Sequence, residues 1–576
     1  MLGGPVVLDG PIGTVGKPLS IKGTLTAAGL RELISVPGMR RIGGSTHYAS
    51  QVHFSPGGRV KVEFKSDLSG LTTQFPDGLS KPAAARWPTT IVWRADEGAK
   101  DNGKRYLDIR MDGKRTQAIF EHDVNSRKGP YFSRGTIGVN RTVALGRPGL
   151  TVQAQNPALD AQAWDDIVGE FSDSAKGGGG RQILPDVSQV DIETPSFLVK
   201  NQTLTNATIS ATQSGNQWNL QLKSDQAQGS GTWVPGSRSN DPGSLTVKLD
   251  TLNIIEPAQT SADTRTLSQK DRDTAKARKS AKQSLPRLDL AVNDLTVYGK
   301  QMGQLILKGY QQPASDDWKV DYFSLVNEGG SLAAQGAIHE QGTAKDLQLK
   351  GKIVVSDLGR FLETYQLGGV IQNGSGQMDA AIDWKNIQNL DLATLNGSLD
   401  GNLQQGRLES VQSSAVKALE LLSLQSFRRL PKFGETLGNS VQSGLTFDTI
   451  RSRMRMDAGR LFVDDFRLNG PSSAIVASGM TDLKSESLDF QAVVVPKLDV
   501  SGASVLAGTI VNPAVGVGAF LTQWLLQAPL QRALTVNYHV TGNWSKPLLN
   551  DVALPSEEEL KNREAEKKVD ELYRTH

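Results

Sequence analysis

One stretch of the sequence has the spacing of a phosphate-binding loop. Gly98, Gly103 and Lys104 stand where such a loop has its glycines and its lysine. Arg105, however, occupies the position at which the loop needs a Ser or Thr to hold a metal ion. The acidic residues around these glycines would also repel a phosphate group. We therefore predict an ordinary hairpin loop here.

The sequence contains few residues or motifs that could support other catalytic or metal-binding chemistry. The chain has no cysteine, which excludes thiol nucleophiles, disulfides and cysteine-ligated metals. It contains neither a Gly-x-Ser-x-Gly nor a His-Glu-x-x-His motif. His47 and His53 could share one face of a strand, but no further ligands follow at metal-site spacing. We predict that the protein is not an enzyme and carries no metal or other cofactor.

The composition indicates a folded protein with many turns. Hydrophobic residues make up 38% of the chain and charged residues 21%, as in water-facing proteins. Lys and Arg number 63 against 60 Asp and Glu, and a net charge of +3 is too small to predict nucleic-acid binding. Glycine is unusually frequent, at 59 residues, which indicates many tight turns.

The elements that these residues belong to are mainly strands. Apolar and polar residues alternate with period two in stretches such as 245–249, 347–355, 378–384 and 534–540. Pairs such as Asn-Gly and Asp-Gly separate the stretches, which is typical of hairpins. Each predicted strand is therefore apolar on one face only.

A hairpin unit recurs in the sequence. Residues 320–325 (VDYFSL) and 463–468 (VDDFRL) are followed at equal spacing by Leu332, Ala334 and Gly336 and by Ile475, Ala477 and Gly479. A looser copy spans 218–229. Such a unit buries its apolar face by stacking on further copies, and the glycine allows close approach of a neighbouring chain.

Helices and linkers are few. Helical spacing of apolar residues predicts helices near 413–430 and 503–528, the second inside the uncharged stretch 500–531. Residues 256–284 are polar and predict a disordered insertion, and 553–576 predict a charged tail. About 35 strands of roughly 15 residues each would form a sheet that two helices cannot cover. The uncovered apolar face must close on itself or hold a lipid.

The C-terminal third resembles a known family. The sequences GSGQMDAAIDW (374–384), GLTFDTIRSRMRMDAGRLFVDDFRLNGPSSAIVASGMTDL (444–483) and YHVTGNWSKP (538–547) follow in the order found in YhdP-type proteins of the AsmA-like family. The likeness is continuous over about 375–550. Residues 1–255 are compatible with the central part of such proteins, and 285–374 would continue the same sheet.

The resemblance implies a fold, a function and a location. The expected fold is mainly β: a long, curled antiparallel β-sheet groove built from stacked hairpins, with a few amphipathic helices near the C-terminus of the AsmA-like region 375–552. The implied function is phospholipid transfer between the inner and outer membranes of a Gram-negative envelope. The implied location is the periplasm, with an anchor to the inner membrane through an N-terminal segment that this chain lacks.

The alternating pattern of the strands predicts which residues would contact lipid. The predicted groove residues are Leu347, Leu349, Ile353, Val355, Met378, Ile382, Trp384, Val536, Tyr538 and Val540. In the uncharged helix, Phe520, Leu521, Trp524 and Leu525, together with the nearby Arg532, could form a lid or a membrane contact. The helix could instead pack as core or, less consistently with its interrupting polar residues, span a membrane. A structural or adhesive β-repeat protein with a self-filled core is the alternative for the whole chain.

Overall fold

The computed structural model describes most of residues 2–559. The residues that it does not describe are 1, 35, 37, 77–78, 97–101, 112–115, 127–129, 175–181, 200–201, 238–240, 256–285, 313–314, 316, 342–343, 365–370, 388–393, 409–444, 472, 497–534, 544–545, 555, 557 and 560–576. The chain forms two compact units, residues 1–282 and 283–576, and each is described by itself.

The first unit is a sheet with two short helices. Its strands are β1 (Gly3–Asp9), β2 (Leu19–Thr26), β3 (Ile42–Ser55), β4 (Arg59–Ser66), β5 (Leu71–Thr73), β6 (Thr89–Ala95), β7 (Lys104–Met111), β8 (Thr116–Asp123), β9 (Arg134–Val139), β10 (Gly149–Gln155), β11 (Leu159–Asp160), β12 (Val187–Val199), β13 (Gln202–Ser214), β14 (Gln217–Lys223), β15 (Ala227–Val234) and β16 (Ser244–Ile254). The helices are α1 (Ala27–Leu33) and α2 (Ala161–Ser174), and two 3-10 turns lie at Met39–Arg41 and Pro56–Gly58.

Most neighbouring strands of this unit pair antiparallel, as hairpins do. The pairs β9–β10, β10–β12 and β11–β12 are parallel instead. A parallel neighbour requires a crossover connection, and α2 stands in the connection between β10 and β12. The expected antiparallel pairing therefore holds for most of this unit, and these three parallel pairs depart from it.

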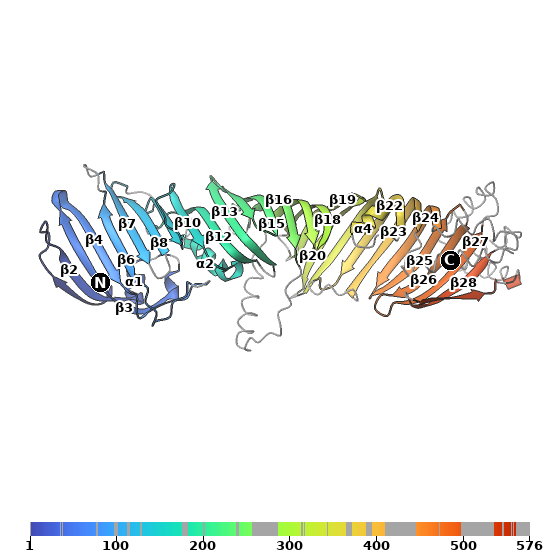
Figure 1. Ribbon diagram of the computed structural model, residues 1–576, viewed down its shortest axis with the longest axis horizontal. Coiled ribbons are helices and arrows are strands. Elements are labelled where there is room, and N and C mark those ends of the chain that lie inside the picture. The colour runs from blue at the N-terminus through green and yellow to red at the C-terminus, as the bar shows by residue number, and fades with distance from the viewer. Residues whose placement is uncertain are drawn as a thin grey trace, which may run out of the picture. The chain divides into compact units, whose positions relative to one another are not determined.

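The second unit is a continuous meander of antiparallel hairpins (Figure 1). Its strands are β17 (Arg287–Val297), β18 (Lys300–Gln311), β19 (Trp318–Asn327), β20 (Gly330–Gln341), β21 (Ala344–Val355), β22 (Ile371–Trp384), β23 (Leu395–Leu408), β24 (Leu445–Asp457), β25 (Arg460–Asn469), β26 (Ser473–Asp482), β27 (Ser487–Pro496), β28 (Val536–Asn543) and β29 (Lys546–Val552). One helix, α4 (Leu358–Thr364), joins β21 to β22.

Strand pairing gathers the apolar residues of this unit on one face. Leu347 pairs with Trp384, Leu349 with Ile382 and Ile353 with Met378. The intervening residues, such as Lys350 and Lys352, lie on the opposite face because side chains alternate along a strand. We call the face that carries Leu349 the inner face and the opposite one the outer face.

The repeated sequence unit is also repeated in the structure. In β19–β20, Val320 pairs with Gly336, and the register shifts before the next pair. In β25–β26, Val463 pairs with Gly479, and the same shift follows. Such bulges increase the local twist of a strand and bend a sheet. The looser copy, β14–β15, pairs without a shift, so it shares the hairpin but not the bulge.

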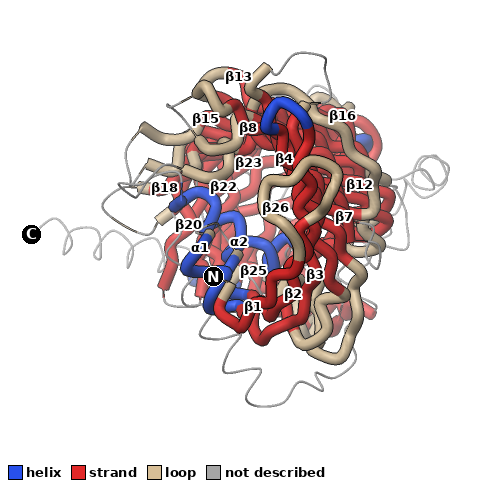
Figure 2. The backbone as a smooth tube through the Cα atoms, turned by 90° about the vertical axis from the view of Figure 1, so that its left-hand side faces the viewer, coloured by secondary structure: helices blue, strands red, loops and turns tan. Residues whose placement is uncertain are grey.

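Helices α1 and α4 lie against apolar faces of the described sheets. In the first unit, Leu30 of α1 packs against a cluster that contains Leu25 and Tyr48 of the neighbouring strands. Figure 2 looks onto this end of the unit, where α1 lies beside β1 and β2 close to the N-terminus. In the second unit, α4 contacts β22 and β18. Both helices cover only a small part of a sheet.

The mainly β fold and the hairpin construction were predicted correctly. The helices expected near 413–430 and 503–528 and the insertion at 256–284 lie outside the described residues. The expected boundary between 374 and 375 falls inside β22, so the sheet continues across it.

Candidate functional site

The inner face of β19–β22 presents a continuous set of partly exposed apolar side chains. Of the predicted groove residues, Leu347, Leu349, Ile353, Met378 and Trp384 are half-buried, and Ile382 is 37% exposed. All six lie on β21 or β22 and meet in cross-strand pairs. The structure therefore brings these predicted residues together on one surface that water reaches.

One end of this surface is covered. Val355, also predicted as a groove residue, is only 2% exposed. A side chain added at Gly330, the cross-strand neighbour of Val355, would lie close to the Phe361 ring of α4. Asn327 fixes the helix in place, since its amide nitrogen donates to the Thr364 hydroxyl at 3.1 Å. Helix α4 thus closes the inner face at one end of these strands.

The other end of these strands carries two tryptophans. Trp318 pairs with Ile338, Ile338 with Leu347, Leu347 with Trp384 and Trp384 with Leu395. These five half-buried residues form a row across β19–β23, which we call the rim row. Tryptophan suits a boundary between an apolar and a wet region because its ring is apolar and its N–H is polar.

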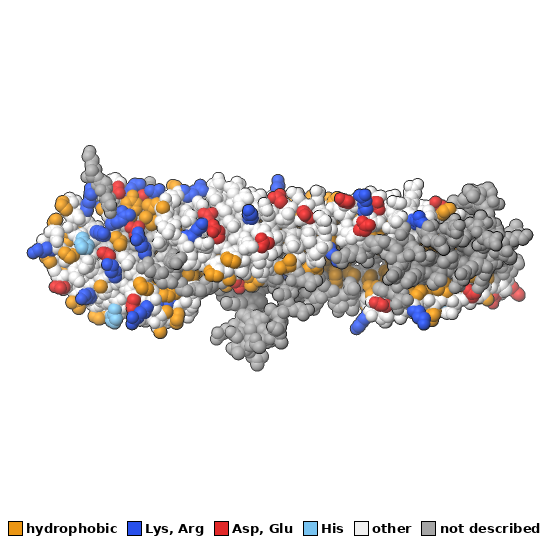
Figure 3. Space-filling view, in the orientation of Figure 1, with side chains coloured by type: hydrophobic (Ala, Val, Ile, Leu, Met, Phe, Trp, Pro, Cys, Tyr) orange, Lys and Arg blue, Asp and Glu red, His pale blue; other side chains and the backbone are white. Residues whose placement is uncertain are grey.

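The outer face of the same strands is charged. Cross-strand ion pairs join Lys308 to Asp289 at 3.0 Å and Lys352 to Asp379 at 3.6 Å. Arg453 and Asp400 form another at 3.3 Å. Figure 3 shows Lys, Arg, Asp and Glu side chains standing close together on the surface of this unit. One face of the sheet therefore suits water and the other suits apolar groups.

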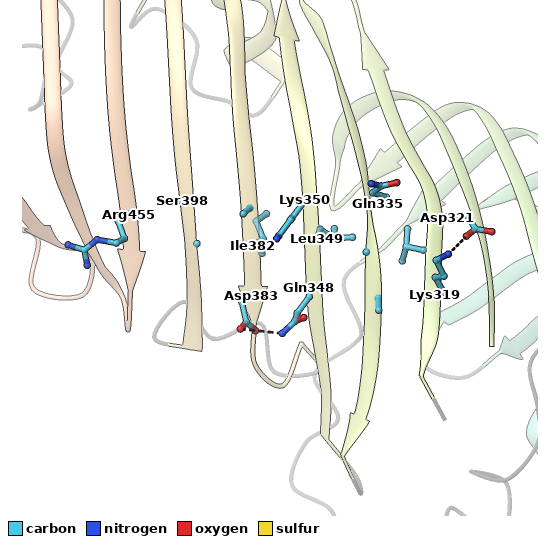
Figure 4. Close-up of a pocket in the computed structure, with 15 residues that line it drawn as sticks. Lys319, Asp321, Gln335, Gln348, Leu349, Lys350, Ile382, Asp383, Ser398 and Arg455 are labelled. Atoms are coloured by element: carbon cyan, nitrogen blue, oxygen red, sulfur yellow. Dashed lines mark hydrogen bonds and ion pairs between the residues drawn. The ribbon is translucent and has the colours of Figure 1, made fainter. Parts of the chain in front are cut away.

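A hollow of about 790 Å³ runs across β19–β24. It is lined by one inner-face row, Val320, Gly336, Leu349, Ile382 and Gly397, and by residues at the alternate, outer-face positions of the same strands, such as Lys350, Ser398 and Arg455. Figure 4 shows that polar neighbours are paired, Gln348 with Asp383 and Lys319 with Asp321.

The three predicted groove residues of β28 have a different environment. Val536, Tyr538 and Val540 are at most 8% exposed and pack with Phe447, among others, in one hydrophobic cluster. In this structure these side chains fill a core and do not line an open surface. The predicted lid or membrane-contact residues Phe520, Leu521, Trp524, Leu525 and Arg532 lie outside the described residues.

Of the residues with phosphate-loop spacing, Gly98 lies outside the described residues, and Gly103 and Lys104 lie at the start of β7. Lys104 follows the turn between β6 and β7, and these strands pair as the predicted hairpin. Its ammonium group bonds the buried carboxylate of Glu121 at 3.3 Å. Within the described residues, no group of three or more His, Asp or Glu side chains could hold a metal ion.

No helix in the described part of the chain combines the length and the hydrophobicity needed to cross a bilayer.

Sequence reasoning missed a charged pair next to the rim row. Glu340 and Lys345 form an ion pair of 2.7 Å one step beyond Ile338 and Leu347 on the inner face. Extending the period-two pattern of residues 347–355 back to Lys345 would have placed Lys345 on the inner face. The position of Trp318 at the start of a strand would likewise have pointed to this end of the sheet.

An open sheet with one apolar and one charged face defines a class of protein that can hold lipid chains along its length. The chain belongs to the YhdP family, whose model matches residues 1–549. It is similar to the intermembrane phospholipid transporter YhdP of Escherichia coli strain K12, with 28% identity over 233 residues. The matched region is 40% of this chain and 18% of that transporter, so it spans less than a fifth of the relative. No solved structure matches the chain.

Proposed function

We propose that this chain forms part of a phospholipid conduit and carries acyl chains along the inner face of its sheet. The observation that carries the proposal is the uncovered row of half-buried apolar side chains on β19–β23, opposite a face of ion pairs. Family membership and the similarity to a phospholipid transporter support the same conclusion.

The energetics favour a continuous track. Each buried methylene is worth about 0.8 kcal/mol, so two acyl chains exposed to water would cost on the order of tens of kcal/mol. A lipid that slides from one cross-strand pair to the next keeps most of its apolar surface covered. Weak, similar contacts along the strands also avoid a deep energy minimum, in which a lipid would stop moving.

We propose a periplasmic location and contacts with both membranes. These finer points follow the family resemblance. Supply of lipid to the outer membrane would then support the integrity of that membrane. In this proposal the chain has no catalytic step, because its residues bind and guide an unmodified substrate.

Photo-crosslinking in cells tests the proposal. A photoreactive amino acid at Leu349 or Ile382 should capture phospholipid, because both side chains lie on the open inner face. The same residue at Lys350 or Lys352 should not, because these neighbours on the same strand face outward. Equal capture at inner and outer positions would contradict the proposal.

A self-filled β-repeat is the second candidate, and the cluster around Phe447 and Tyr538 favours it for β24–β28. Both can hold in different stretches of one sheet. Crosslinkers at Val536 should then capture little lipid compared with those at Ile382. Strong capture at Val536 would show that the cluster opens to admit lipid.

A further inference from the structure

The first unit has an apolar face of its own on β7–β10. Leu107 pairs with Phe120, and Phe120 pairs with Gly135. Gly135 in turn pairs with Leu150. Side chains alternate along a strand, so these residues share one face, and the buried, ion-paired Glu121 lies on the other. In its chemistry this apolar face matches the inner face of the second unit.

The same face continues on β12–β14, where its side chains reach solvent. Ala154 lies on the same face of β10 as Leu150 and pairs with Ile192. Ile192 pairs with Ile209, and Ile209 pairs with Leu222. The side chains of Ile192, Ile209 and Leu222 are half-buried. A lipid could therefore lie on this part of the face as on the second unit.

On β8–β10 a segment of the chain itself covers the apolar face. Phe120 is 5% exposed and Leu150 only 1%. Ile183 and Leu184, which precede β12, pack against the cluster that contains both residues. We call residues 182–186 the crossing segment. Because β10 and β12 are parallel neighbours, their connection has to cross one face of the sheet, and here its last part crosses the apolar face.

The loop between β8 and β9 holds the crossing segment in place. The Tyr131 amide donates to the Gln182 carbonyl at 2.6 Å, and the Phe132 amide donates to the Ile183 carbonyl at 3.0 Å. The loop is itself attached to β8, because Nδ1 of His122 lies 2.6 Å from the Tyr131 carbonyl oxygen. The rings of His122 and Tyr131 also stack, with centroids 4.0 Å apart. Hydrogen bonds and apolar side chains thus hold the crossing segment against the sheet.

We propose that the crossing segment is a gate in the lipid track of the first unit, an inference that rests on the proposed function. With the gate down, Ile183 and Leu184 occupy the place that acyl chains would take over Phe120 and Leu150. An acyl chain covers the same kind of surface, so lipid can replace these side chains without leaving the sheet residues in water. Only the two aliphatic side chains of the gate then return to solvent.

The gate makes the passage of lipid depend on two states of this segment. Lipid reaches the covered part of the face only when the gate is lifted, so every contact that holds the gate down lowers the amount of lipid bound there. Tethering the gate should therefore remove lipid from β8–β10, and weakening its apolar contacts should add lipid there. Neither change should affect lipid on β12–β14, which lies outside the gate.

A disulfide that tethers the gate tests the proposal, because the native chain has no cysteine to interfere. Tyr131→Cys and Gln182→Cys place one thiol on the β8–β9 loop and one on the gate, at the two residues that a backbone hydrogen bond joins. A photoreactive amino acid at Leu107 reports lipid beside Phe120, and one at Leu222 reports lipid outside the gate. The full chain is irradiated with vesicles of equal parts phosphatidylethanolamine and phosphatidylglycerol, and captured lipid is quantified by mass spectrometry.

The oxidised double variant should capture less lipid at Leu107 than the same protein after reduction, by at least about threefold. Capture at Leu222 should be the same in both forms. Gln182→Cys alone, treated with the same oxidant, is the matched control and should show no change at either position. A mass measurement confirms that the disulfide has formed.

A second variant weakens the gate and does not depend on the disulfide. Ile183→Ser combined with Leu184→Ser removes the apolar contacts of the crossing segment, so capture at Leu107 should rise at least about threefold over the native protein. Both side chains are half-buried at the surface of their cluster, and circular dichroism verifies that the variant is folded.

The outcomes separate the gate from the proposed function. Equal capture at Leu107 in the oxidised and reduced protein overturns the gate, and so does unchanged capture in the serine variant. Lipid at Leu222 with none at Leu107 in the reduced protein and the serine variant also overturns it, because the cover is then permanent. A chain that captures no lipid at Leu222 or at Ile382 contradicts the proposed function instead.

Discussion

Glu121, on β8, is a buried carboxylate that holds two cations. Its side chain is 6% exposed and accepts a hydrogen bond from Arg134 at 2.7 Å as well as from Lys104. Burial by itself would raise the pKa of Glu121, but the hydrogen bonds and charges of Arg134 and Lys104 outweigh it and lower that pKa below 4.5. A carboxylate with a lowered folded-state pKa stabilises the fold above its unfolded-state pKa, and this stability is lost as the pH falls.

We therefore predict that Glu121→Gln reduces the acid sensitivity of the first unit. At neutral pH the variant should lose about 2 kcal/mol, since Arg134 and Lys104 lose their partner but stay about a third exposed to water. The difference in melting temperature between pH 6.5 and pH 3.5 should be smaller in the variant than in the native protein. Thermal unfolding followed by circular dichroism measures both.

The exposed ion pair Lys308–Asp289 provides the comparison. Both side chains are nearly half exposed, so Asp289→Asn should change stability by less than about 0.5 kcal/mol at either pH. An unchanged pH dependence in Glu121→Gln would show that other groups control acid unfolding.

At the scale of elements, the bulged hairpin is the unit that shapes the sheet. In β19–β20 and β25–β26, the glycine opposite the valine lies where a side chain would overlap the backbone of the next strand. At Gly336 a Cβ atom would overlap the carbonyl oxygen of Gln348, and at Gly479 that of Asp489. The glycine thus allows three strands to approach at the bulge.

We predict that Gly336→Ala destabilises the second unit by about 2 kcal/mol or more, since the backbone of β21 must shift. Gly169→Ala, in α2, is the matched control, because nothing lies within 4 Å of the added carbon. The control should stabilise its helix slightly, as alanine favours helices over glycine. Denaturant unfolding of both variants measures the difference, and equal effects would refute the role of the glycine.

At the scale of the whole molecule, the prediction concerns the uncharged stretch 500–531. Its residues Trp524 and Leu525 follow helical spacing and are expected either to pack as core or to act as a lid for lipid. The double variant Trp524→Ser, Leu525→Ser distinguishes these readings. Core packing predicts a loss of several kcal/mol and poor expression. A lid predicts a folded protein that transfers less lipid, so an unfolded variant would eliminate the lid.

Local patterns in the sequence were sufficient to predict the strands, the hairpins and the apolar face of the sheet. Alternation of apolar and polar residues decides which side chains share a face, and this property needs no knowledge of distant contacts. The shared apolar faces that carry Leu349 and Ile382 and the recurring hairpin unit that ends at Gly336 and Gly479 follow from residues close together in the chain.

Only the tertiary structure decided how much of that face is open. Val355 and Ile382 have the same pattern in the sequence, but α4 covers the first and leaves the second exposed. Tyr538 alternates as Leu349 does, yet strands β24–β28 enclose it. The sequence also did not predict the parallel strand pairs around β10 or the charged pair Glu340–Lys345 beyond the rim row. Burial depends on which distant elements pack against a residue, and that information is not contained in its immediate neighbours.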